Sequence, residues 1–161
     1  MSKLRLVLRE LHRGEAGLAR DLLAVADRHR ADHEIFHVAR DVAGWSQEHV
    51  RRIAEVGADF GVRLNPEPRW TLPGVGVLGR RAGAALARRP ASGLLLLADL
   101  RHVHRKAAGV SLDWELLAQA AQAMKKQSLM QLAADCHPQT LRQMRWANAQ
   151  LKVTSPQVIA S

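Results

Sequence analysis

Two side chains capable of acid–base chemistry interrupt apolar stripes with helical spacing. One is Glu15, in a row of aliphatic residues that recur every three or four positions: Leu4, Leu8, Leu11, Leu18, Leu22 and Val25. The other is His49, in a row of the same spacing: Ile35, Val38, Val42, Trp45, Ile53, Val56 and Phe60. Because a helix packs its apolar stripe against other helices, both side chains are predicted to be buried. A buried carboxylate and a buried imidazole can neutralise each other as an ion pair, or they can bind a metal ion.

The composition predicts that helices carry these side chains. None of the 161 residues is Tyr and aromatic residues make up only 4%, while Ala and Leu are abundant, which favours helix over strand. A chain of this length is typical of one domain with a real hydrophobic core. We therefore expect a single all-α domain over residues 1–161.

Four helices are predicted, over about residues 2–29, 32–60, 93–126 and 128–152. Asp32 is expected to cap the second helix and Gly61 to end it. The third helix keeps its stripe in phase through Gly109, so it is expected to be continuous. The fourth helix is expected to end before Ser155-Pro156 and to bury a stripe of seven residues: Met130, Ala134, His137, Leu141, Met144, Asn148 and Leu151.

The segment between the second and third helices, about residues 61–92, is rich in residues that exclude a long helix: Pro66, Pro68, Pro73, Gly74, Gly76, Gly79 and Pro90. A connection of this length is unusual between compact helices unless it travels the length of a bundle. The predicted fold is therefore a four-helix bundle made of two antiparallel hairpins joined by a long crossover loop.

Counting outward from each tight turn shows which side chains share a level in an antiparallel hairpin. Glu15 and His49 are about equally far from a turn centred near Ala31. Glu115 and His137 are about equally far from a turn centred near Gln127. Each hairpin thus offers one acid and one histidine at a common level.

This arrangement resembles the ferritin-like superfamily of four-helix bundles. In that superfamily a di-iron or di-manganese centre is held by one Glu from each of two helices and by a Glu-x-x-His pair from each of the other two. The resemblance implies that Glu15 and Glu115 correspond to the single carboxylates, and that His49 and His137 correspond to the two histidines.

The chain departs from the superfamily's motif at two positions. Ser46 and Ala134 stand three residues before His49 and His137, where the paired carboxylates belong. The resemblance therefore implies a reduced metal site, for Fe, Mn or Zn, or a bundle that has no metal.

A literal acid-x-x-histidine match lies elsewhere, at Glu34-Ile35-Phe36-His37. The spacing puts Glu34 and His37 on one face of the second helix, at its beginning and away from the level of Glu15. Neighbouring side chains that could join an alternative metal cluster at this end are Asp27, His29, His33, Asp99 and His102. An acid in the first turn of a helix also has a simpler role, because it complements the helix dipole.

Two functional hypotheses follow from these residues. The first is a ferritin-like bundle that binds metal or serves in a stress response through its inward Glu and His side chains. The alternative is a non-catalytic bundle that acts as a homodimer or with a protein partner, in which Glu15 and His49 only pair with each other and fix the helix register.

The charge and the single cysteine limit the possible partners and locations. The formal net charge of +9 could attract nucleic acid, but the Arg residues are scattered, which favours solvated helix faces over a nucleic-acid surface. Cys136, the only cysteine, is expected to be a small buried side chain in a reducing compartment. With no leader segment and no apolar run longer than about residues 94–98, we expect a cytoplasmic protein without membrane insertion.

Overall fold

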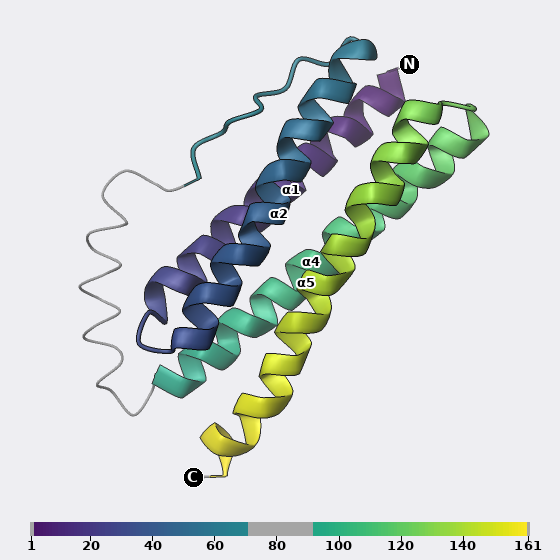
Figure 1. Ribbon diagram of the computed structural model, residues 1–161. Coiled ribbons are helices and arrows are strands. Elements are labelled where there is room, and N and C mark those ends of the chain that lie inside the picture. The colour runs from purple at the N-terminus through teal and green to yellow at the C-terminus, as the bar shows by residue number, and fades with distance from the viewer. Residues whose placement is uncertain (1, 71–91, 161) are drawn as a thin grey trace.

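The computed structural model describes residues 2–70 and 92–160 of the chain. These residues form four helices, α1 (Ser2–Arg28), α2 (His33–Asp59), α4 (Ser92–Ala123) and α5 (Gln127–Ile159), and contain no strand. Figure 1 shows the α1–α2 and α4–α5 hairpins packed side by side. The predicted all-α four-helix bundle is confirmed. Residues 71–91, most of the predicted crossover, lie outside the described residues.

The helices run in alternating directions around the bundle. Helix α1 packs against α2 and α4, and α5 packs against α4 and α2. Contacts between α1 and α4 pair His29 with Asp99 at one end and Gly14 with Val110 further along, so these two helices are antiparallel. Helices α2 and α5 are also antiparallel, since Glu34 meets Gln150 whereas Arg52 meets Asp135. It follows that α2 and α4 lie diagonally and run parallel, as the predicted crossover requires.

The predicted capping and terminating residues of α2, and the predicted continuity of α4, are confirmed. Asp32 caps α2 by accepting a hydrogen bond from the backbone N–H of Ile35 at 3.1 Å. Gly61 follows the C-terminus of α2 with φ at 70°, a left-handed conformation that costs glycine little. Helix α4 is continuous through Gly109.

The predicted end of α5 is wrong. This helix continues past residue 152 to Ile159, and it contains Pro138 and Pro156 without a break. Each proline removes one hydrogen bond to the carbonyl four residues earlier. Those residues, Ala134 and Lys152, are exposed, so water can satisfy the freed carbonyls.

The core contains the predicted apolar stripe of α1, most of the predicted stripe of α2 and the buried face of α4. The predicted stripe of α5 is wrong. The buried face of α5 is rotated by about one residue and consists of Leu129, Leu132, Ala133, Cys136, Thr140, Gln143 and Ala147. The predicted residues are only half-buried or exposed. The prediction failed because it assumed an apolar stripe, whereas α5 buries the polar side chains of Thr140 and Gln143, which find hydrogen-bond partners inside the bundle.

None of the helices among the described residues has the length and apolar character that a membrane span needs.

Candidate functional site

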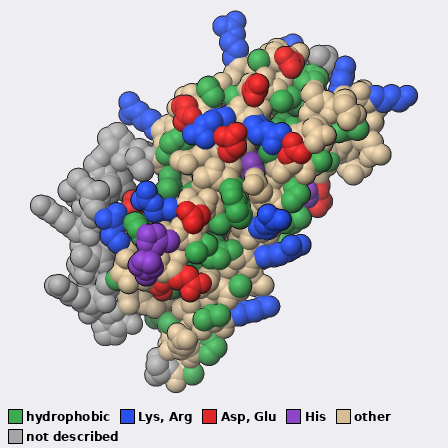
Figure 2. Space-filling view, viewed as in Figure 1, with side chains coloured by type: hydrophobic (Ala, Val, Ile, Leu, Met, Phe, Trp, Pro, Cys, Tyr) green, Lys and Arg blue, Asp and Glu red, His purple; other side chains and the backbone are tan. Residues whose placement is uncertain are grey.

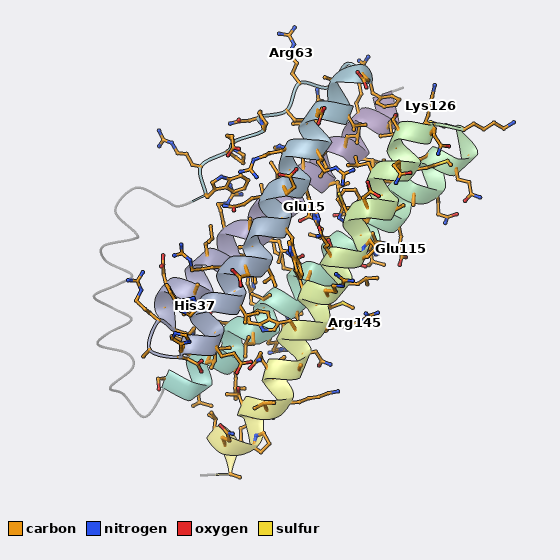
Figure 3. The ribbon with its side chains drawn as sticks, viewed as in Figure 1. Glu15, His37, Arg63, Glu115, Lys126 and Arg145 are labelled. Carbon is orange, nitrogen blue, oxygen red and sulfur yellow. The ribbon has the colours of Figure 1, made fainter. Side chains whose placement is uncertain are left out.

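One carboxylate oxygen at the centre of the bundle joins all four helices. Glu15 of α1 is fully buried, and its Oε1 accepts three hydrogen bonds. The donors are the His49 ring Nδ1 of α2 at 2.9 Å, the Trp114 indole N–H of α4 at 2.7 Å and the Thr140 hydroxyl of α5 at 3.0 Å. Figure 3 shows Glu15 between the two hairpins. The predicted inward position of Glu15 and its common level with His49 are confirmed.

His49 is a double donor. Its Nδ1 faces Glu15 Oε1, and its Nε2 lies 2.7 Å from the side-chain oxygen of Gln139. Both of these oxygens are acceptors, so the geometry favours a hydrogen on each ring nitrogen, that is, an imidazolium. The ring is 1% exposed and meets the Trp114 ring edge-on, with 5.8 Å between centroids. The arrangement is a buried ion pair with both ring nitrogens engaged.

The two partners shift each other's pKa in opposite directions. Burial alone would raise the pKa of Glu15, but the His49 charge and polar contacts with His49, Ser46 and Trp114 outweigh it, so the Glu15 pKa lies below its ordinary 4.5. Burial, and to a lesser degree the charge of Arg52, would lower the pKa of His49. Glu15 and Gln139 outweigh both and raise the His49 pKa above its ordinary 6.5. Both shifts favour the charged forms of the pair.

Further polar side chains extend this layer between α2 and α5. The Gln143 amide donates to the Val42 carbonyl at 2.7 Å and to the Ser46 hydroxyl at 2.8 Å. Ser46 and Gln143 are fully buried. These bonds and the His49–Gln139 bond join α2 to α5 in the interior, in addition to the Glu34–Gln150 and Arg52–Asp135 pairs nearer the surface.

The other two residues of the predicted central set do not join Glu15 and His49. The side chain of Glu115 is exposed, and Figure 3 shows it at the outer edge of the α4–α5 hairpin. His137 is half-buried and its Nε2 bonds to the Ser111 hydroxyl at 2.7 Å. Only Glu15 and His49 of the predicted four come together.

The alternative pair at the start of α2 is also separate. Glu34 accepts a hydrogen bond from Gln150, and exposed His37 lies beside His33 with 4.2 Å between ring centroids. Figure 2 shows histidine side chains exposed at this end of the bundle. Of the neighbours that the sequence suggested, Asp99 is committed to another cluster. It accepts from Arg28 at 2.8 and 2.9 Å and pairs with His29 at 2.7 Å, which ties α1 to α4.

The central residues do not fit a dinuclear metal centre as they stand. Such a centre needs several carboxylates and free imidazole nitrogens, whereas this layer has one carboxylate and its histidine has no free nitrogen. Among residues 2–70 and 92–160, no three His, Cys, Asp or Glu side chains gather where they could hold a metal ion. Buried Cys136 is a neutral thiol, since burial raises its pKa to about 12. Metal binding by Glu15, His49, Glu115 and His137 therefore stays a prediction from sequence.

Sequence reasoning missed most of the partners of Glu15 and His49. Trp114 is a fully buried core side chain, and its indole N–H also donates to the carboxylate. Gln139 and Thr140 were not identified at all. A buried acid on α1 requires donors on the facing helices, and that requirement is the one signal that could have directed attention to polar residues on α5.

Comparisons with protein families, with curated proteins and with solved structures found no match to this chain.

Proposed function

We propose that this chain is a helical scaffold that acts through contacts with other protein chains, and that Glu15 and His49 hold its helices in register. One observation carries the proposal. Oε1 of Glu15 is bonded to a donor from each of the other three helices, so this carboxylate already joins the whole bundle, while its Oε2 is buried without a hydrogen-bond partner among the described residues.

The register function follows from the geometry of the network. A helix that slides along its neighbours by one turn moves its side chains by about 5.4 Å, which is more than any of these hydrogen bonds can tolerate. Since α1, α2, α4 and α5 each contribute a side chain, the sliding of any one helix would leave a buried charge or donor unpaired. Buried polar groups are best known for this kind of specificity.

Exposed leucines support a role in association. Leu6 on α1 and Leu112 and Leu116 on α4 are 58–62% exposed. Large apolar side chains exposed side by side, as Leu112 and Leu116 are on α4, are typical of surfaces that bind another protein. The Arg residues support a nucleic-acid role less well, because several are paired with acids, among them Arg28, Arg51 and Arg52.

Kinship with the ferritin-like bundles is also part of the proposal. The two antiparallel hairpins, the parallel direction of α2 and α4, and the acid and imidazole at the centre support it. In this chain the Glu15–His49 ion pair would hold the helices together at the place where those bundles hold metal.

Metal analysis tests the proposal. We expect full-length protein from cells grown with added iron, manganese and zinc to contain none of these metals in stoichiometric amount, and a chelator to leave its thermal unfolding unchanged. The expectation rests on Glu15 Oε1 and on the two ring nitrogens of His49, all of which already have hydrogen-bond partners inside the bundle. Stoichiometric metal that Glu15→Gln removes, and that the exposed-residue control Glu55→Gln retains, would overturn the proposal.

A further inference from the structure

We infer that the partner of the scaffold is a second copy of the same chain, bound through the outer face of α4 in an antiparallel, twofold arrangement. The inference rests on the proposed function and names the surface that performs it. Helix α4 carries two halves of a self-complementary surface on its solvent side, and reversal of one copy brings the unlike halves together.

The C-terminal half of this face projects apolar side chains. Leu112 and Leu116 are one helical turn apart and are 61% and 62% exposed. Leu6 of α1, 58% exposed, lies at a nearby level, because Gly14 of α1 faces Val110 and Asp113 of α4 and the two helices are antiparallel. Glu115 flanks the leucines, is exposed, and has no ion-pair partner among the described residues.

The N-terminal half of the same face is hollow and basic. A cavity of about 510 Å³ is lined by Ala98, Arg101, His102, Arg105 and Lys106. Asp21 already neutralises two of these side chains, since it contacts His102 at 2.9 Å and Lys106 at 3.3 Å. Arg101 and Arg105 are exposed, and in the described part of the chain neither has an ion-pair partner.

An antiparallel pair of α4 helices matches these halves. Glu115 is 14 residues from Arg101 and 10 from Arg105, so a twofold axis near Gly109 places each Glu115 beside the partner's two guanidinium groups. The same axis places Leu112 and Leu116 over the partner's hollow, where the aliphatic stems of the arginines can cover them.

Gly109 lies where the two helix backbones would cross. It is exposed, and a Cβ at this position would meet no atom within 4 Å. A glycine inside a helix is unfavourable by about 1 kcal/mol relative to alanine, so it has no evident benefit within one chain. Between two copies it permits close approach of the backbones and leaves room for the partner's Leu112.

Sedimentation equilibrium of the full-length protein tests the inference. We expect a dimer whose dissociation constant rises about tenfold or more in Leu112→Glu and Leu116→Glu. The matched control is Val153→Glu on α5, because Val153 is equally exposed, at 59%, but lies outside the proposed surface; this variant should dimerise as the wild type does.

A charge-reversal series and a glycine replacement separate dimerisation from folding. Arg105→Glu and Glu115→Arg should each weaken the dimer, and the double variant should recover part of the loss, since the reversed charges pair again across the axis while Arg101 still repels the new arginine. Gly109→Leu should raise the melting temperature of the monomer, because it removes a helix glycine, and should nevertheless weaken the dimer.

The outcomes distinguish this inference from the proposed function. A dimer that is indifferent to all of the α4 substitutions would overturn the proposed interface and leave the scaffold function in place. Wild-type protein that stays monomeric up to about 1 mM would overturn self-association itself. Stoichiometric Glu15-dependent metal would overturn the scaffold function whatever the state of association.

Discussion

Glu15→Ala is expected to destabilise the fold by about 3–5 kcal/mol, the usual cost of removing one partner from a buried ion pair. The substitution leaves the His49 imidazolium buried without its counter-charge, and it leaves the Trp114 N–H and the Thr140 hydroxyl without their acceptor. Urea unfolding of the full-length chain, followed by far-UV circular dichroism at about pH 6, measures the loss.

Two controls establish the reason for this loss. Glu55→Ala removes an exposed carboxylate from α2 and should change stability by no more than about 0.5 kcal/mol. The double variant Glu15→Leu with His49→Leu should be less destabilised than the sum of the two single variants, because it removes both charges together. A Glu15→Ala variant within about 1 kcal/mol of wild type would show that the pair is not essential to the core.

Stability should fall as the pH rises above the ordinary pKa of histidine. The raised pKa of His49 means that the folded protein retains a proton that the unfolded chain loses above 6.5. The contribution of His49 is therefore complete below 6.5, and it declines by about 1.4 kcal/mol per pH unit until the folded pKa is reached. The lowered pKa of Glu15 acts in the opposite sense, since its contribution is complete above 4.5 and is lost as the pH falls. The pair thus stabilises the fold most between these two values.

Unfolding free energies measured from mildly acidic to alkaline pH test this dependence. His49→Gln should abolish the decline in unfolding free energy above pH 6.5. The control His37→Gln changes an exposed histidine near the beginning of α2 and should retain the decline. An unchanged slope in His49→Gln would assign the decline to a different group.

The part of this site that could be predicted from sequence is the part that interrupts a regular pattern. Glu15 and His49 each stand alone in an apolar helical stripe, and their equal distances from the α1–α2 turn placed them at one level. An apolar stripe follows from the repeat of the helix alone, and the buried residues of α1, α2 and α4 have this repeat. The prediction that Glu115 points inward is wrong, because one residue is a rotation of about 100° around the helix, which carries the side chain after buried Trp114 out to solvent.

The remaining partners could not be predicted because burial of a polar side chain depends on a partner from another helix. Thr140 and Gln143 have the sequence pattern of surface residues, and only Glu15, Ser46 and the Val42 carbonyl make their burial favourable. The exposed carbonyls that accommodate Pro138 and Pro156 within α5 are likewise a property of the packed bundle.

Measurement of the protonation state of the His49 ring is the most direct test of a Glu15–His49 ion pair at the centre of the bundle. Nitrogen-15 NMR of the full-length chain at about pH 7 distinguishes an imidazolium from either neutral tautomer. Hydrogen on both ring nitrogens is the predicted result, because both nitrogens face oxygen acceptors. A bare nitrogen on this ring, or a His49 signal that shifts when iron, manganese or zinc is added, would contradict the account.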